Sequence, residues 1–287
     1  IDTFAKALNH TANYVAADDK KELDIAVSLL ASINYRVDMV IDKIPGGKTN
    51  RYLLLREIPP FRGGGFYVFA LDNKPPPDRE QPLVIEIPTP LDEWMVLESG
   101  TWLFLELKGR AMAVAGTSKK TSWDKSTDVL FNPQTFFHTF HRVIGRNNVL
   151  QVRTHTGETR RLLEGVRKKE GQIRAPAVQS SLWVKGSFPP GLSLARLNQL
   201  AGDFSIKWET PPLRNMQRRQ STGGFAEFFL SRRAARRTMT RSLLNMRDIE
   251  PQTGLERIDG YLQSWLLGTK NEIAGKGTNR YKAMSLE

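Results

Sequence analysis

Short apolar segments alternate with helix-like segments between residues 83 and 209, and this alternation constrains the fold more than any other feature of the chain. Strands are predicted at 83–87, 111–116, 148–154, 180–185 and 204–209, and helices at about 93–108, 133–144, 158–169 and 192–201. Such alternation is typical of a mostly parallel sheet with helices on both faces. We therefore expect an α/β protein with three layers, α/β/α.

The first third of the chain predicts two helices followed by a hairpin. Residues 3–17 and 19–42 have helical periodicity, and Pro45–Lys48 breaks the second helix. Tyr52–Ile58 and Gly65–Leu71 then have the composition of two strands.

The loop between these two strands, Pro59–Gly65, contains Arg62 followed by three glycines. Glycines allow a backbone to approach a ligand closely, and Arg62 adds a positive charge. The spacing is not that of a phosphate-binding loop, and no helix start follows, so a hairpin loop is the preferred reading. Lys74–Asp78, rich in proline, is predicted to be a stiff connector.

The C-terminal part is predicted to be helical and basic. Long helical stretches are expected from Gly224 to about Asn245 and from Leu255 to Leu267, followed by a loose tail. The predicted organisation is an N-terminal helical segment at 1–48, an α/β core at 49–215, an arginine-rich helical segment at 216–268 and a tail at 269–287.

Composition indicates a folded protein with a strongly basic surface. The 287 residues are 40% hydrophobic and carry a net charge of +12. Such a surface attracts polyanions. The alternative is that the positive charge only keeps the protein soluble and binds no polyanion. No run of apolar residues is long enough to span a membrane. The chain has no cysteine, which excludes disulfides, thiolate zinc sites and cysteine nucleophiles.

The absence of cysteine does not determine the cellular compartment of the protein. The first residue is Ile1, which fits removal of an export signal but equally fits trimming of the chain. We expect a periplasmic or otherwise exported protein, with the cytoplasm as the alternative.

Three of the four histidines are candidate zinc ligands. His138 and His141 are spaced to share one face of a helix, and His155 follows a predicted strand. Three imidazoles can bind zinc. There is no HExxH motif, and the phenylalanines around His138 favour a helix packed on the sheet, so these two histidines are interpreted first as structural.

Polar residues at other predicted strand ends are candidates for catalysis. Glu209 follows the strand at 204–209 and Arg214 comes shortly after, so the pair suits a general base and a carboxylate clamp, or a salt bridge at the rim. Asp92 and Glu93 follow the first strand of the alternating region, where a helix cap explains them equally well. There is no GxSxG motif to predict a serine nucleophile.

An arginine-rich segment is the most distinctive basic feature. Between Arg214 and Arg241 there are eight arginines, no lysine and one acid, Glu227. Four of these arginines form two adjacent pairs one helical turn apart: Arg232, Arg233, Arg236 and Arg237. Arginine makes planar, bidentate contacts with phosphate and carboxylate, so we expect anion binding here, with internal acid pairing as the alternative.

The order of segments over residues 55–215 resembles the zinc-dependent amidohydrolases and carboxypeptidases of the N-formylglutamate amidohydrolase and poly-γ-glutamate hydrolase kind. Pro88-Thr-Pro90 stands where these proteins have a Pro-His-Pro-like motif, and the turn Ala115–Lys119 stands at their second site turn. Thr127–Phe131 stands at an acid-to-histidine motif, and Val152–His155 at a strand that ends in histidine. Glu209 and Arg214 match the last motif.

The resemblance implies a three-layer α/β protein with a site at the carboxyl ends of central strands. Asp128, His155, Glu209 and Arg214 carry over residue by residue. Thr89 and Phe131 stand where ligands are expected and cannot bind zinc as an imidazole does. The resemblance therefore implies a degenerate relative with no cofactor.

The leading functional hypothesis is a non-catalytic binding or scaffolding module for an anionic polymer or partner protein, with exported biopolymer machinery as its setting. The residues predicted to bind the substrate or anion are Arg62, Lys119, Arg153, Arg232, Arg233, Arg236 and Arg237. One alternative is an active zinc hydrolase of an acidic amide or peptide, with His155 and His138 or His141 as ligands. Another is a nucleic-acid-binding protein that uses the arginine-rich helix, although no known nucleic-acid-binding motif is visible.

Overall fold

The computed structural model describes residues 1–43, 49–72, 83–165, 170–171, 178–243, 250–251 and 257–259. Three predicted features lie outside the described residues: the break at Pro45–Lys48, the connector Lys74–Asp78 and the tail at 269–287. The last part of the predicted basic helix at 158–169 also lies outside them.

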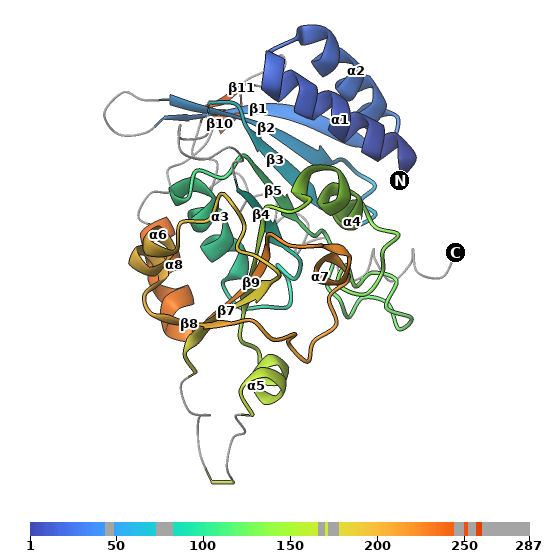
Figure 1. Cartoon of the computed structure of the whole chain (residues 1–287). Helices are drawn as coiled ribbons and strands as arrows, with labels where there is room; N and C mark the ends of the chain where they lie inside the picture. Colours follow the sequence, from blue (N-terminus) through green and yellow to red (C-terminus); the bar gives the residue numbers. More distant parts are fainter. Residues whose placement is uncertain are drawn as a thin grey trace.

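One mixed sheet organises the molecule (Figure 1). Its strands, in the order in which they lie side by side, are β10 (Glu250–Pro251), β11 (Arg257–Asp259), β1 (Tyr35–Lys43), β2 (Thr49–Glu57), β3 (Phe66–Ala70), β5 (Ala111–Val114), β4 (Val84–Ile87), β6 (Val149–Thr154), β9 (Phe225–Leu230), β7 (Ser180–Lys185) and β8 (Phe204–Lys207).

The central strands β5, β4, β6 and β9 are parallel, as expected from helical crossovers. The flanking pairs β1–β2, β2–β3, β3–β5 and β7–β9 are antiparallel. The sheet is therefore α/β in class but mixed rather than mostly parallel. Toward one edge the reason is that hairpins connect β1 to β2 and β2 to β3, whereas at the other edge β7 and β8 are parallel and are joined through a helix at Leu194–Ala201.

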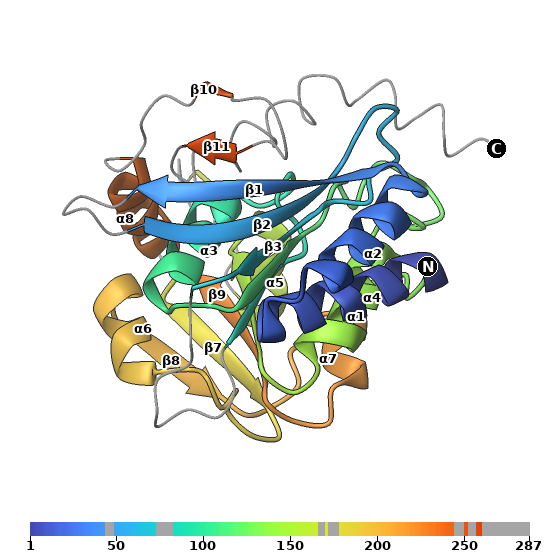
Figure 2. The same ribbon diagram turned by 90° about the horizontal axis from the view of Figure 1, so that it is seen from above.

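Helices cover both faces of the sheet, which gives the expected three layers (Figure 2). One layer contains α1 (Asp2–Ala17), α2 (Lys20–Ala31), α4 (Phe136–Phe140), the π-helix η1 (His141–Gly145) and α7 (Met216–Gln220). The other contains α3 (Val96–Glu106), α6 (Leu194–Ala201) and α8 (Arg232–Leu243). The short helix α5 (Gly157–Leu163) follows β6.

Two hydrophobic clusters hold these layers to the sheet. Phe4 and Leu8 of α1 pack with Tyr67 of β3 on one face, and Leu103 of α3 packs with Val152 of β6 on the other. Burial of each large apolar side chain contributes about 1.5–3 kcal/mol. Strand β1 belongs to the predicted segment 1–48 and β9 to the predicted segment 216–268, yet both are part of the same sheet as the strands of the predicted core.

The prediction of a helix over 19–42 was wrong in its second half. Helix α2 ends at Ala31, and Asn34 adopts a left-handed conformation with φ of 60°. Asparagine tolerates this conformation and often ends helices. The chain then enters β1, which pairs antiparallel with β2.

The prediction of continuous helix after Gly224 was also wrong. Phe225–Leu230 forms β9, a central strand that is buried throughout, and the helix begins only at Arg232. The three residues of β11 likewise replace part of the helix predicted from Leu255 to Leu267. The strand β8 was predicted to be the last strand of the chain. Because β9 lies between β6 and β7, β8 is at the edge of the sheet.

In the described part of the chain, no helix combines the length and the apolar character needed to cross a membrane.

Candidate functional site

A buried polar network occupies the face of the central strands that looks toward α4 and α7. It begins with Glu86 of β4, Gln151 and Arg153 of β6, and Glu227 of β9, all of which are almost fully buried. Gln151 is paired in register with both Glu86 and Glu227. Side chains alternate along a strand, so these polar groups share one face while their apolar neighbours enter the opposite layer.

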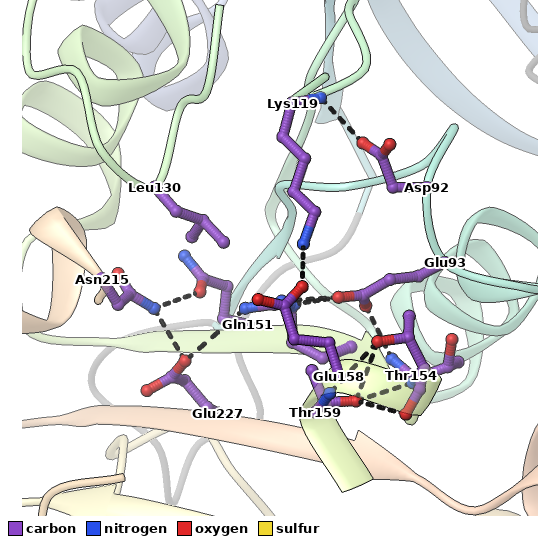
Figure 3. A network of polar contacts seen from close by, with 12 residues as sticks. Asp92, Glu93, Lys119, Leu130, Gln151, Thr154, Glu158, Thr159, Asn215 and Glu227 are labelled. Carbon is purple, nitrogen blue, oxygen red and sulfur yellow. Dashed lines mark hydrogen bonds and ion pairs between the residues drawn. The ribbon is translucent and has the colours of Figure 1, made fainter. Parts of the chain in front are cut away.

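The network is closed near the carboxyl end of β6 by Glu93 (Figure 3). The Oε1 atom of Glu93 accepts hydrogen bonds from the guanidinium of Arg153, at 2.8 Å from Nε, and its Oε2 accepts the backbone N–H of Thr154 at 2.8 Å. Glu93 was interpreted as a possible helix cap. It is instead the principal partner of Arg153.

Glu227 is held by two hydrogen-bond donors and one further cation in the middle of the face. Asn215 Nδ2 donates to it at 2.8 Å, Arg218 Nη1 lies 3.4 Å from Oε2, and Arg153 Nη1 lies 3.9 Å from Oε1. Two buried acids thus face two buried arginines, so the formal charges of Glu93, Glu227, Arg153 and Arg218 cancel.

The pKa values reflect this arrangement. Burial raises the pKa of Glu227, although Arg153 and Arg218 oppose the shift. Burial opposes protonation of Arg153, but Glu93 holds its pKa above the ordinary value. Arg153 was predicted to bind an external anion, and the structure places its guanidinium against internal acids.

His138 and His141 are buried, and their ring nitrogens are occupied. His138 Nε2 lies 2.9 Å from Gln220 Oε1, and His141 Nδ1 lies 2.8 Å from Glu86 Oε1. The two rings are 6.0 Å apart, so the predicted shared face exists. Burial lowers the pKa of His138, which favours the neutral ring.

His155 is separate from that pair and lies just after the end of β6. Its side chain is 5% exposed, and its ring packs 5.8 Å from that of Phe229. Burial first, and then the charges of Arg160, Arg153 and Lys207, lower its pKa to about 4. His155 is therefore a neutral imidazole in positive surroundings at neutral pH.

These placements do not fit a zinc site of the expected kind. Among the residues that the structure describes, no three histidine, aspartate or glutamate side chains are grouped so as to hold a metal ion. Such a site needs about three protein ligands. His138 and His141 are instead engaged with Gln220 and Glu86, which would have to be displaced.

Glu209, Arg214 and Asp128, the three residues predicted to be catalytic, are not brought together by shared contacts. Glu209 is exposed and follows β8, whose carboxyl end points toward the edge where β6 and β9 begin, because β7 runs antiparallel to β9. It therefore does not stand at the carboxyl ends of the central strands. Arg214 stacks on Phe131, with its guanidinium carbon 3.4 Å from the ring centroid.

Asp128 is half-buried in the loop after β5. Its Oδ1 accepts the backbone N–H of Leu130 at 3.0 Å, so it stabilises a turn. Burial raises its pKa, partly offset by that hydrogen bond and by the charges of Lys119 and Arg153.

Lys119 and Arg62 are both engaged with acids. Lys119 Nζ lies 3.4 Å from Glu158 Oε2, and its backbone N–H donates to Asp92 at 2.8 Å (Figure 3). Arg62 Nε lies 3.5 Å from Glu57, whose carboxylate also accepts the backbone N–H groups of residues 62–64. The glycine loop therefore joins a hairpin, as predicted, and its N–H groups are used by an acid of this chain.

The arginines of α8 point to two different sides of the helix. Arg233 and Arg237 line a cavity of 620 Å³ together with polar groups that include Asp203. Arg232 and Arg236 lie near Trp94 instead, with guanidinium carbons 6.0 and 5.9 Å from the ring centroid. The two adjacent pairs seen in the sequence thus become two i, i+4 pairs with different surroundings.

A basic surface with an aromatic centre results at the carboxyl ends of the strands. It consists of Trp94, Arg160, Arg232 and Arg236, which we call the Trp94 surface. Trp94 is 45% exposed, whereas Arg160 is only 9% exposed and its buried Nε has no hydrogen-bond acceptor in the described structure. Burial and the nearby charge of Arg232 both lower the pKa of Arg160.

Comparison of the chain with protein-family models, with curated proteins and with solved structures found no match.

Several important residues of these sites were missed by sequence reasoning. Glu86 and Glu227 are acids inside otherwise apolar strands, and such acids are buried only when they are paired. That signal was available in the sequence. The contacts of Trp94 with α8 and of Asn215 with β6 and β9 join residues far apart in the chain, and no local pattern indicates them.

Proposed function

We propose that this chain is a binding module for an anionic polymer and that the Trp94 surface is its binding site. The observation that carries the proposal is a buried cationic donor beside another cation: Arg160 is largely buried, its Nε has no hydrogen-bond partner in the described structure, and it lies close enough to Arg232 for the two charges to repel. A buried donor without an acceptor is costly, about 1–3 kcal/mol. A bound carboxylate, sulfate or phosphate would remove that cost.

The position of the arginines on α8 supports the same proposal. Arg232 and Arg233 begin the helix, and its first turn contains no acid. The amino end of a helix already carries partial positive charge, so cations there are unfavourable by about 0.3–1 kcal/mol each. An anionic ligand offsets both effects. By contrast, Arg153 and Arg218 on the neighbouring strand face are neutralised within the protein.

Trp94 adds a feature that suits a polymer rather than a free ion. An exposed aromatic ring among cations offers apolar contact beside charge, as in surfaces that bind single-stranded nucleic acid. An acidic polysaccharide or a polyglutamate chain also combines charge with a less polar backbone. The binding experiment therefore includes a nucleic acid among its anionic probes.

From the resemblance to zinc amidohydrolases the proposal takes only the position of the site in the fold. A site at the carboxyl ends of central strands is where an open α/β sheet binds ligands. We propose that this chain uses that edge for binding without zinc, since His138 and His141 are engaged with Gln220 and Glu86 and no three possible ligands are grouped among the described residues. An active zinc hydrolase is the alternative, and bound zinc that is lost on replacing His155 would favour it.

The decisive variant removes two exposed charges from the Trp94 surface. In the full chain, Arg232→Ala/Arg236→Ala should weaken binding of labelled heparin, poly-γ-glutamate or oligo-dT, measured by fluorescence anisotropy, by roughly tenfold for each arginine that contacts the ligand. The control is Arg142→Ala/Arg219→Ala, which removes two exposed arginines from η1 and α7 and lowers the net charge equally.

Equal losses in the two variants would contradict the proposal, because binding would then depend on net charge alone. A selective loss in the Arg232/Arg236 variant supports it. The probe that binds most tightly identifies the polymer class, and a preference for oligo-dT would favour the nucleic-acid alternative.

A further inference from the structure

Ser221, His141 and Glu86 form a linear hydrogen-bonded triad away from the Trp94 surface. Ser221 Oγ lies 3.2 Å from His141 Nε2, and His141 Nδ1 lies 2.8 Å from Glu86 Oε1. The three residues come from the end of α7, from η1 and from β4. A nucleophile within reach of a base that is itself oriented by a third group is the arrangement of nucleophilic catalysis.

The carboxylate fixes the tautomer of the imidazole. As a carboxylate, Glu86 can only accept hydrogen bonds, so His141 Nδ1–H donates to its Oε1, and Gln151 Nε2 donates to its Oε2 at 3.1 Å. In the neutral ring the lone pair is then on Nε2, which faces Ser221. This is the tautomer in which histidine can remove a proton from a serine hydroxyl.

The local backbone is shaped around this contact. His141 begins η1, and π-helical turns of this kind occur frequently at functional sites. Gly145, the last residue of η1, has no side chain, and a Cβ there would lie 3.1 Å from Glu86 Oε1 and 3.3 Å from His141 Nδ1. A glycine at this position therefore lets the turn close over the His141–Glu86 pair.

We propose that Ser221 is an activated nucleophile that hydrolyses short-chain esters. Ser221 Oγ bonds to the acyl carbon while His141 takes its proton, and the ester bond breaks as that proton passes to the departing alcohol. Water then attacks the acyl group, His141 carries a proton back to Ser221, and the carboxylic acid is released. Ser221 is 5% exposed, so only a small acyl group can reach its Oγ.

A second acceptor defines the competing interpretation. The hydroxyl of Ser221 also lies 2.9 Å from the carbonyl of Gln217, one turn earlier in the chain. If the hydroxyl permanently donates there, the triad is only a structural link between α7, η1 and β4. The two interpretations differ in the reactivity of Ser221, which can be measured directly.

The test is covalent labelling of the intact chain with a fluorophosphonate, a probe that reacts with activated serines. Peptide mapping should find the label on Ser221. The internal control is Ser32, which is exposed and also donates to a helical carbonyl, that of Leu29, but makes no hydrogen bond to a histidine in the described part of the chain. Absence of label on Ser221, or equal labelling of Ser32, would overturn the proposal without any variant.

Variants then assign the roles. His141→Gln should slow labelling by about 100-fold or more, because general-base catalysis contributes at least that factor. Glu86→Gln should also slow it, and Glu86→Asp should restore part of the rate, since a carboxylate rather than a neutral amide orients the ring. Labelling at an unchanged rate in folded His141→Gln would contradict the proposal. Hydrolysis of p-nitrophenyl acetate provides the matching activity measurement.

Discussion

Replacement of His155 by glutamine should flatten the acid dependence of stability. In the folded chain the pKa of this histidine is about 4, against 6.5 for an ordinary histidine, mainly because of burial. The folded state thus holds a neutral ring that the unfolded state protonates on acidification. The stability that comes from the neutral ring is present above about pH 6.5 and is lost as the pH falls toward about 4.

The magnitude follows from the two pKa values. Proton linkage for a shift from 6.5 to about 4 gives a loss of about 2 kcal/mol in the free energy of unfolding between about pH 7 and pH 5. The loss reaches about 3 kcal/mol near pH 4. Other titrating groups, including Asp128 and Glu227 with their raised pKa values, contribute equally to both proteins and cancel in the difference.

Urea unfolding followed by tryptophan fluorescence measures this difference. The unfolding free energy of the wild type minus that of His155→Gln should fall by about 2 kcal/mol between about pH 7 and pH 5, whatever its value at neutral pH, provided that the slope with urea is the same. Parallel curves would refute the reasoning, because they would mean that His155 binds its proton equally well in both states.

Two further substitutions test the buried network and the chain reversal before β9. Glu227→Leu should lower the free energy of unfolding in urea by about 3–5 kcal/mol, because Arg153 and Arg218 lose a shared buried partner. A loss below about 1 kcal/mol would contradict the importance of that pairing. Gly224→Ala should lower the melting temperature, since φ is +59° and the added Cβ would lie 1.7 Å from the carbonyl oxygen of Asn147; an unchanged melting temperature would mean that the turn is not constrained as described.

Much of the α/β core was predictable because its local signals agree with its final environment. The strands β2 to β7 and the helices α1, α3 and α6 were predicted near their observed bounds. Their apolar patterns match the faces that they bury. The three-layer architecture followed from that alternation.

Strand β9 was missed because neighbouring residues gave a stronger local signal than the strand itself. Phe225–Leu230 is followed directly by an arginine- and alanine-rich helix, and the whole segment was interpreted as helical. Only tertiary pairing with β6 and β7 fixes it as a strand. This error also removed Glu227 from the predicted site and gave Glu209 a role that the position of β8 does not support.

The candidate binding site was only partly visible in the sequence. The arginine cluster indicated anion binding, but it did not show that Arg232 and Arg236 face Trp94 while Arg233 and Arg237 line another cavity. The closeness of Arg160 to Arg232 depends on how α5 and α8 follow β6 and β9. Such a contact between distant segments has no local sequence pattern.

The most direct test of the proposed binding function is the salt dependence of polyanion affinity. Binding through exposed arginines releases counterions, so the logarithm of the binding constant should fall linearly with the logarithm of salt concentration. Removing Arg232 and Arg236 should make that slope shallower by about two, one for each lost contact. The same slope in the wild type and in Arg232→Ala/Arg236→Ala would contradict the account, because the Trp94 surface would then take no part in binding.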